Sequence, residues 1–103
     1  MLLDAIAADP TATWTVADMA ERAAMSTRHL ARVFPRQVGM PPAQYVERAR
    51  VEFATGLLDS GDEALDVVAR RSGFGSSETL RRAFQRVIGV SPGGYRSRFR
   101  TTG

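Results

Sequence analysis

An internal repeat limits the fold of this 103-residue chain more than any other feature of its sequence. Leu30 begins a frame that reads Leu-x-Arg-x-Phe, then Gly, then Pro-x-x-Tyr, and Leu80 begins a second copy 50 residues later. Upstream, Ala20 matches Ala69 at an offset of 49 residues, so the second copy holds one extra residue before its frame. Two copies are too few for a solenoid, and we infer a tandem duplication of one helical unit.

Apolar residues recur at helical spacing along the chain, and no stretch alternates as a strand would, so the sequence predicts an all-α fold. Capping residues, prolines and glycines divide the chain into about seven helices. The expected helix starts are Thr15, Ser26, Pro42, Asp62 or Glu63, Ser76 or Ser77, and Ser91, and the expected ends are Gly39, Gly61 and Gly89.

Each repeat predicts a short helix, a tight turn and a second helix, which is the helix-turn-helix arrangement. Ala20 and Ala69 supply the small residues that two crossing helices need, and Met25 and Phe74 supply an apolar residue to hold the turn. The second helix of each unit buries Leu and Phe and leaves a polar face that could enter a DNA major groove. An ordinary helical bundle with two similar hairpins is the alternative.

The longest helix is expected between the two repeats. We take residues 1–103 as a single DNA-binding domain, with a first helix-turn-helix unit at 9–41, a linker helix at 42–59 and a second unit at 62–100. The tail at 101–103 is expected to fray. The expected apolar face of the linker helix consists of Tyr45, Val46, Ala49, Phe53 and Leu57.

Positive charge is concentrated in the second half of the chain. Residues 1–63 contain six arginines and nine acids, a net charge of −3, whereas residues 64–103 contain eight arginines and two acids, a net charge of +6. Every basic residue is Arg, whose planar guanidinium suits phosphates and base edges. This distribution favours an anionic partner, although a solvated surface would have the same composition.

Three segments give the chain a resemblance to the AraC/XylS family of bacterial transcription regulators. They are MSTRHLARVF at 25–34, GFGSS at 73–77 and FQRVIGVSPGGYR at 84–96. The resemblance implies a homeodomain-like pair of helix-turn-helix units, joined by a rigid helix, that places two recognition helices in successive major grooves of double-stranded DNA. A linker of about 25 Å, at about 1.5 Å per residue, is compatible with a groove repeat of about 34 Å.

The resemblance also implies which residues contact DNA. In the second unit, Glu78 could accept a hydrogen bond from cytosine. The interpretation we prefer is that Glu78 caps the helix N-terminus or forms a salt bridge with Arg82. Arg70 and Arg71 could contact phosphate or stabilise a helix C-terminus. The implied base-reading residues are Arg28, Ala31 and Arg32 in the first unit and Ser77, Glu78, Arg81 and Arg82 in the second. The candidate phosphate contacts are Thr27, Arg36, Arg86 and Arg96.

Two residue choices depart from a regular pattern of this kind. Pro35 falls inside the expected first recognition helix, where it should kink or shorten the C-terminal end. Gly93 and Gly94 fall in the first turn of the last helix and should weaken it. Trp14, Tyr45 and Tyr95 are expected to have packing roles.

Nothing in the sequence predicts an enzyme. The chain has no Cys and one His, His29, and its acids form no inward-facing cluster, so we expect no catalytic site, metal or cofactor. No apolar run approaches the about 20 residues of a membrane span, and we expect a cytoplasmic location. We further expect a monomer that is the C-terminal part of a larger regulator, with RNA polymerase as a second partner. A helical protein-interaction module is the alternative function.

Overall fold

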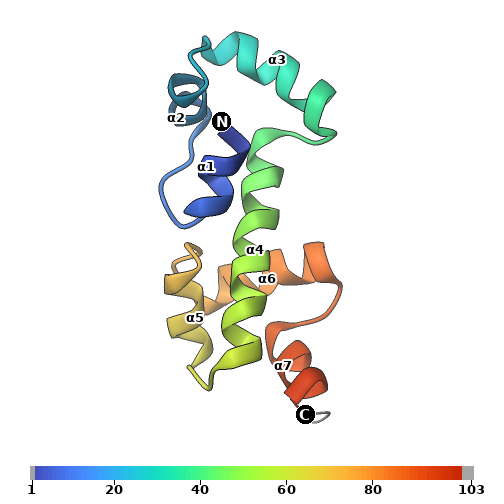
Figure 1. Cartoon of the computed structure of the whole chain (residues 1–103). Helices are drawn as coiled ribbons and strands as arrows, with labels where there is room; N and C mark the ends of the chain where they lie inside the picture. Colours follow the sequence, from blue (N-terminus) through green and yellow to red (C-terminus); the bar gives the residue numbers. More distant parts are fainter. Residues whose placement is uncertain (1, 101–103) are drawn as a thin grey trace. The chain divides into compact units, whose positions relative to one another are not determined.

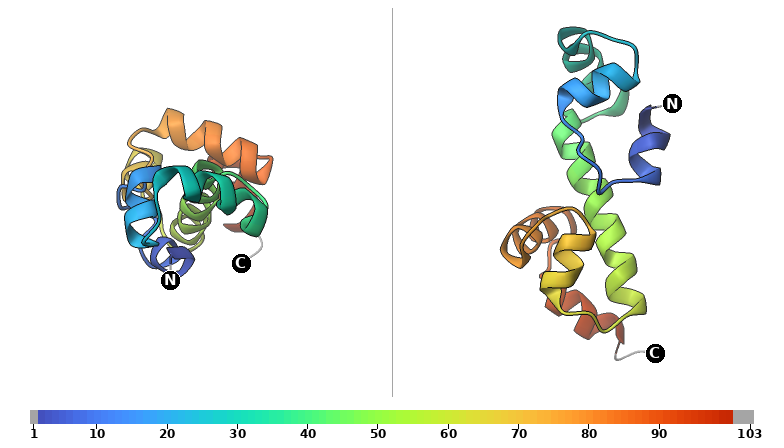
Figure 2. Two further views of the ribbon diagram at one scale, coloured as in Figure 1. Left: turned by 90° about the horizontal axis from the view of Figure 1, so that it is seen from above. Right: turned by 90° about the vertical axis from the view of Figure 1, so that its left-hand side faces the viewer.

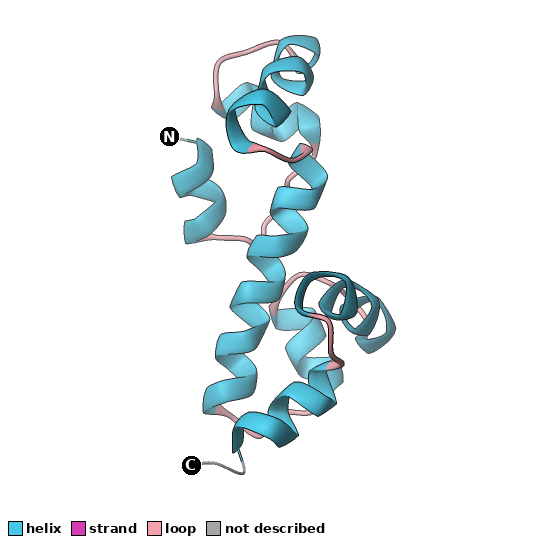
Figure 3. Cartoon of the chain, turned by 90° about the vertical axis from the view of Figure 1, so that its right-hand side faces the viewer, coloured by secondary structure: helices cyan, strands magenta, loops and turns pink. Residues whose placement is uncertain are grey.

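The computed structural model describes residues 2–100, and for residues 99 and 100 it describes the backbone alone. This part of the chain forms seven helices and no strand (Figure 1; Figure 3), which confirms the predicted all-α class. The tail at 101–103, expected to fray, lies outside the described residues. The helices are α1 (Leu2–Ala8), α2 (Val16–Arg22), α3 (Thr27–Val38), α4 (Pro42–Ser60), α5 (Leu65–Arg71), α6 (Ser77–Ile88) and α7 (Pro92–Arg100).

The chain divides into two compact units, one ending at Ala49 and one beginning at Arg50, which we call unit 1 and unit 2. Each unit has its own apolar core, and α4 contributes to both, with Val46 in unit 1 and Val51 and Leu58 in unit 2. Removing apolar surface from water in these two cores is the main force that holds each unit together. The other buried core residues are Ile6, Met19, Ala20, Leu30 and Phe34 in unit 1, and Ala54, Val68, Ala69, Leu80, Ala83 and Phe84 in unit 2.

The predicted apolar face of α4 is partly wrong. Val46 is buried, and Tyr45 and Ala49 pack against the unit 1 core as expected, but Phe53 is 39% exposed. The buried positions of α4 in unit 2 are 51, 54 and 58, with Leu57 packed beside them. The prediction assumed one stripe of positions four residues apart along the whole helix. Because α4 serves two cores, each core uses its own set of positions.

Side-chain caps begin four of the helices where the sequence predicts them. Thr15 Oγ1 accepts a hydrogen bond from the backbone N–H of Asp18, and the Asp18 carboxylate accepts one from the N–H of Thr15. This capping box satisfies two backbone donors at the start of α2. Ser26, Ser76 and Ser91 cap α3, α6 and α7 in turn, each accepting from the N–H three residues further on.

The start of α5 differs from the prediction, which placed it at Asp62 or Glu63. Ala64 is the N-cap residue and makes no side-chain cap, since it has no polar side-chain atom. The Glu63 carboxylate instead forms an ion pair with Arg71 in the last turn of the same helix. Glu63, one of the two acids expected to begin the helix, therefore pairs with Arg71, an interaction that sequence spacing does not predict.

Pro35 does not shorten α3. Helices α3 and α6 have 12 residues each, and both end at a glycine with a left-handed backbone, Gly39 with φ 92° and Gly89 with φ 93°. Pro35 lacks the N–H that would bond to the carbonyl of Ala31, so α3 loses one backbone hydrogen bond at an exposed residue. The Pro35 carbonyl still accepts from the N–H of Gly39, at 2.9 Å, which completes the last turn.

The duplication is repeated in the aromatic packing of the two units. Phe34 and Tyr45 meet edge to face with ring centroids 5.8 Å apart, and Phe84 and Tyr95 do so at 5.4 Å. The two tyrosines thus have the packing roles expected of them. Burial raises the pKa of Tyr95 above its ordinary value, and the charge of Asp59 and a hydrogen bond to its side chain raise it further.

Trp14 packs in unit 1 as expected. Its indole Nε1 donates to the carbonyl oxygen of Asp9 at 2.8 Å, and the Arg22 guanidinium lies over its ring at 5.8 Å from the centroid. Within residues 2–100, no helix is both long enough and apolar enough to cross a bilayer.

Candidate nucleic-acid interface

Helices α2 and α3 of unit 1 meet at a tight turn. Ala20 is 2% exposed, which confirms the predicted small residue at the helix crossing. The N–H of Met25 donates to the carbonyl of Ala20 at 2.8 Å, and Ala24 takes a left-handed backbone with φ 57°. Met25 is 37% exposed and lines a hollow with Leu30 and Phe34, so its side chain covers this core in part. The backbone hydrogen bond from Met25 to Ala20 also holds the turn.

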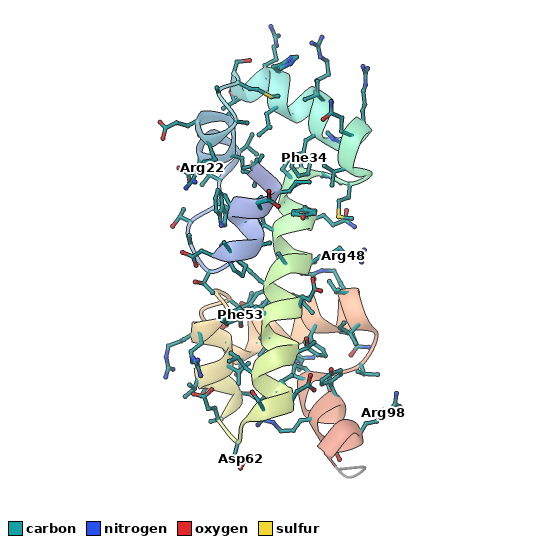
Figure 4. The ribbon with its side chains drawn as sticks, viewed as in Figure 1. Arg22, Phe34, Arg48, Phe53, Asp62 and Arg98 are labelled. Carbon is teal, nitrogen blue, oxygen red and sulfur yellow. The ribbon has the colours of Figure 1, made fainter. Side chains whose placement is uncertain are left out.

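The outer face of α3 carries the predicted DNA contacts of unit 1. Leu30 and Phe34 turn into the core, 2% and 4% exposed, and Figure 4 shows Phe34 on the inner side of the helix. The opposite side of α3 therefore has Arg28 and Arg32, one helical turn apart, in solvent. The predicted contact residues exposed on α3 are Thr27, Arg28, Ala31, Arg32 and Arg36.

One neighbour of these arginines was not assigned a binding role from the sequence. The Arg32 Nη2 atom lies 3.2 Å from His29 Nδ1, and both side chains are exposed. The two residues are three positions apart on a helix, where side chains can meet, so the spacing was visible in the sequence. The sequence predicts that His29 is not a metal ligand and suggests no other role for it. In the described part of the chain, no group of three or more His, Asp or Glu side chains could hold a metal ion.

Helices α5 and α6 of unit 2 meet at a turn that repeats the first one with an insertion. The N–H of Phe74 donates to the carbonyl of Ala69 at 2.8 Å, as that of Met25 does in unit 1. Gly73 and Gly75 both have a positive φ, of 89° and 84°, and Gly75 is the extra residue of the second repeat. Phe74 packs against the unit 2 core, which confirms its predicted role.

The outer face of α6 is charged but partly self-paired. Arg81 Nη2 donates to Glu78 Oε1 at 2.8 Å, and both side chains are more than half exposed. Glu78 lies in the first turn of α6, where the helix dipole favours an acid as predicted. The alternative prediction of a salt bridge to Arg82 is wrong, because the bridge goes to Arg81, three positions on. Ser77, the first residue of α6, is partly buried. The exposed predicted contacts on α6 are Glu78, Arg81, Arg82 and Arg86.

Arg96, a candidate phosphate contact, lies largely inside unit 2. Its Nη1 donates to the backbone carbonyl of Glu63 at 2.7 Å, and its Nε and Nη2 atoms are buried without a hydrogen-bond partner among the described residues. This placement ties α7 to the start of α5 and does not favour a phosphate contact. Arg71 is likewise engaged by the Glu63 carboxylate, which was neither of the two roles considered for it.

Views of the ribbon from two further sides show the same pair of elements in each unit, a short helix followed by a longer outer one (Figure 2). Each outer helix buries its Leu and Phe and leaves an Arg at the equivalent position in solvent, Arg32 on α3 and Arg82 on α6. A helix of this kind, with a polar outer face rich in guanidinium groups, is chemically suited to a DNA major groove.

A protein-family model described as a helix-turn-helix domain matches residues 19–98. The HTH-type transcriptional regulator Rv1931c of Mycobacterium tuberculosis is 46% identical over 84 residues, which is 82% of this chain and 32% of that protein. An AraC-like transcription regulator of Streptomyces lividans is 44% identical over 88 residues, 85% of this chain and 29% of that protein. The chain thus spans about a third of the length of these relatives.

Solved structures with the same fold include the DNA-binding domain of AdpA, a global transcriptional factor crystallised with a target DNA. It superposes with a TM-score of 0.91 and 35% identity, over 98% of this chain and 91% of that one. A Chromobacterium violaceum regulator with an AraC-type DNA-binding domain has a TM-score of 0.88, over 99% of this chain and 91% of that one. At 20% identity, the second likeness concerns the fold alone.

Proposed function

This chain belongs to the AraC family of helix-turn-helix transcription regulators, and from that membership we propose that it binds a specific duplex DNA sequence. In this proposal, α3 and α6 are the recognition helices, and each enters a major groove. The observation that carries it is the equivalent exposure of Arg32 and Arg82 on two helices whose other faces are buried. The AdpA domain, crystallised with a target DNA, supports it through its close likeness over nearly the whole chain.

In this proposal, arginines are the main base-reading residues. Arg28, Arg32 and Arg82 can each donate two hydrogen bonds to the O6 and N7 atoms of guanine, which is worth about 1–3 kcal/mol of discrimination per base pair. Ala31 offers its methyl group to a thymine methyl. Arg81 has to leave Glu78, or share it, before it can reach a base. Ser77 is a weaker candidate because it is partly buried.

Contacts with the phosphate backbone would fix the register without reading sequence. Thr27 and Arg36 lie before and after the base-reading residues of α3, and Arg86 lies in the last turn of α6. Arg96 is left out of this set because its guanidinium is largely buried. We propose that the two helices occupy successive grooves, so that the site has two short blocks about ten base pairs apart.

The test is selection from a random-sequence duplex pool at about 150 mM salt, followed by sequencing of the retained DNA. Wild type should recover two blocks, Arg32→Ala should relax one of them, and Arg82→Ala should relax the other. Arg48→Ala is the matched control, because it removes the same charge from an exposed position of α4 outside both recognition helices (Figure 4). Recovery of no motif would favour a helical protein-interaction module instead.

The biological context of this binding is part of the same proposal. We propose that the chain is the DNA-binding part of a longer regulator, since it spans about a third of its relatives' length. Its action on transcription would involve RNA polymerase as a second partner, in the cytoplasm. One chain supplies two recognition helices, so the isolated domain should bind as a monomer to an asymmetric site, which sedimentation of the complex can check.

A further inference from the structure

A hydrogen bond between two exposed side chains of α3 links His29 to Arg32. Arg32 Nη2 and His29 Nδ1 are 3.2 Å apart. A guanidinium has five N–H donors and no acceptor, so His29 Nδ1 must be the acceptor in this bond. Where this bond forms, Nδ1 is the ring nitrogen without a proton. One Arg32 hydrogen is used, and four remain for a ligand.

The start of the helix fixes the backbone of His29. The backbone N–H of His29 donates to Oγ of the Ser26 cap at 3.1 Å, and the next residue, Leu30, is 2% exposed in the core. The backbone from which the ring projects is thus fixed on both sides. Because its backbone is fixed, the His29 imidazole can restrict the longer and more flexible side chain of Arg32.

We propose that His29 is a positioning residue that holds the Arg32 guanidinium in the orientation that reads a guanine. This inference rests on the proposed function, in which Arg32 contacts a base. An exposed arginine samples many rotamers and loses that freedom when it binds. Because the bond to His29 restricts these rotamers before DNA binds, part of the loss of side-chain entropy occurs already in the free protein. The two Nη groups still present a planar edge to the O6 and N7 atoms.

The second unit lacks this arrangement at the equivalent positions. Thr79 takes the place of His29, and its hydroxyl oxygen accepts from Ser76 Oγ at 3.0 Å. Among the described residues, no side chain forms an ion pair with Arg82, the counterpart of Arg32. The base read by Arg32 should therefore be discriminated more sharply than the base read by Arg82.

The test uses the 103-residue chain, the duplex that wild type selects, and single-base variants of that duplex. His29→Ala should lower discrimination at the Arg32 base by about three- to tenfold and leave the block read by α6 unchanged. His29→Gln, whose side-chain oxygen can accept from Arg32, should restore most of the loss. Thr79→Ala, at the equivalent position of unit 2, is the matched control and should not affect the Arg32 base.

A double-mutant cycle separates positioning from direct contact. In an Arg32→Ala background, His29→Ala should have no further effect on discrimination. An undiminished effect in that background would overturn the inference, because His29 would then contact DNA itself. No change on His29→Ala in the wild-type background would also overturn it. If wild type selects no motif, the proposed function fails and the inference fails with it.

Discussion

Replacing Leu80 with alanine should weaken unit 2 and leave unit 1 intact, because the two units have separate cores. Leu80 is fully buried in unit 2. The substitution removes three carbon atoms, worth about 2.4 kcal/mol of transfer free energy, and leaves a cavity that adds to the loss. The free energy of local unfolding in unit 2 should therefore fall by about 3 kcal/mol. That loss corresponds to roughly 150-fold faster exchange of amides that open with this unit.

Hydrogen exchange on the whole chain measures this directly. In Leu80→Ala, the amides of α5 and α6 should exchange faster, while those of α2 and α3 keep the wild-type rate. Leu30→Ala is the matched variant, since Leu30 occupies the equivalent position in the repeat and is 2% exposed. It should accelerate exchange in unit 1 alone. Equal acceleration in both units for either variant would refute the reasoning, because the two cores would then behave as one.

Three other changes test separate parts of the structure. The raised pKa of Tyr95 adds stability that is complete below about pH 10 and is lost as pH rises through the folded-state pKa. Tyr95→Phe should therefore reduce the fall of the urea midpoint at alkaline pH. An unchanged fall would contradict this. Glu78→Gln should change stability by less than about 1 kcal/mol, because its ion pair with Arg81 is exposed. The same substitution should raise DNA affinity in an anisotropy titration, because it frees the Arg81 guanidinium. Weaker binding would contradict this. Pro35→Gln restores a backbone N–H and introduces the residue found at the equivalent position of unit 2, Gln85. It should stabilise unit 1 by about 1–2 kcal/mol in urea unfolding. A loss of stability would mean that the proline is better accommodated than we infer.

Features set by neighbours along the chain were predictable from the sequence. The Thr15, Ser26 and Ser76 caps and the left-handed glycines were found because a few adjacent residues decide them. The small residues at the helix crossings, Ala20 and Ala69, were found because the repeat aligned them.

Features set by distant parts of the chain were missed. Arg96 was assigned to phosphate, but its guanidinium meets the carbonyl of Glu63, 33 residues away, and no local pattern reveals that pairing. Phe53 was assigned to a buried face because one periodic stripe was extended along a helix that serves two cores. The bond between His29 and Arg32 is different, since its spacing is local. It was missed because the single histidine was considered only as a metal ligand and rejected in that role.

The most direct test of the central claim, that α3 and α6 both read DNA from the major groove, is guanine N7 methylation interference on the selected duplex. Methyl groups at N7 lie in the major groove and block the hydrogen bonds that arginines make there. We expect two clusters of interfering guanines about ten base pairs apart, one absent in Arg32→Ala and the other in Arg82→Ala. A single cluster, or no interference while specific binding persists, would contradict the claim that both helices read bases.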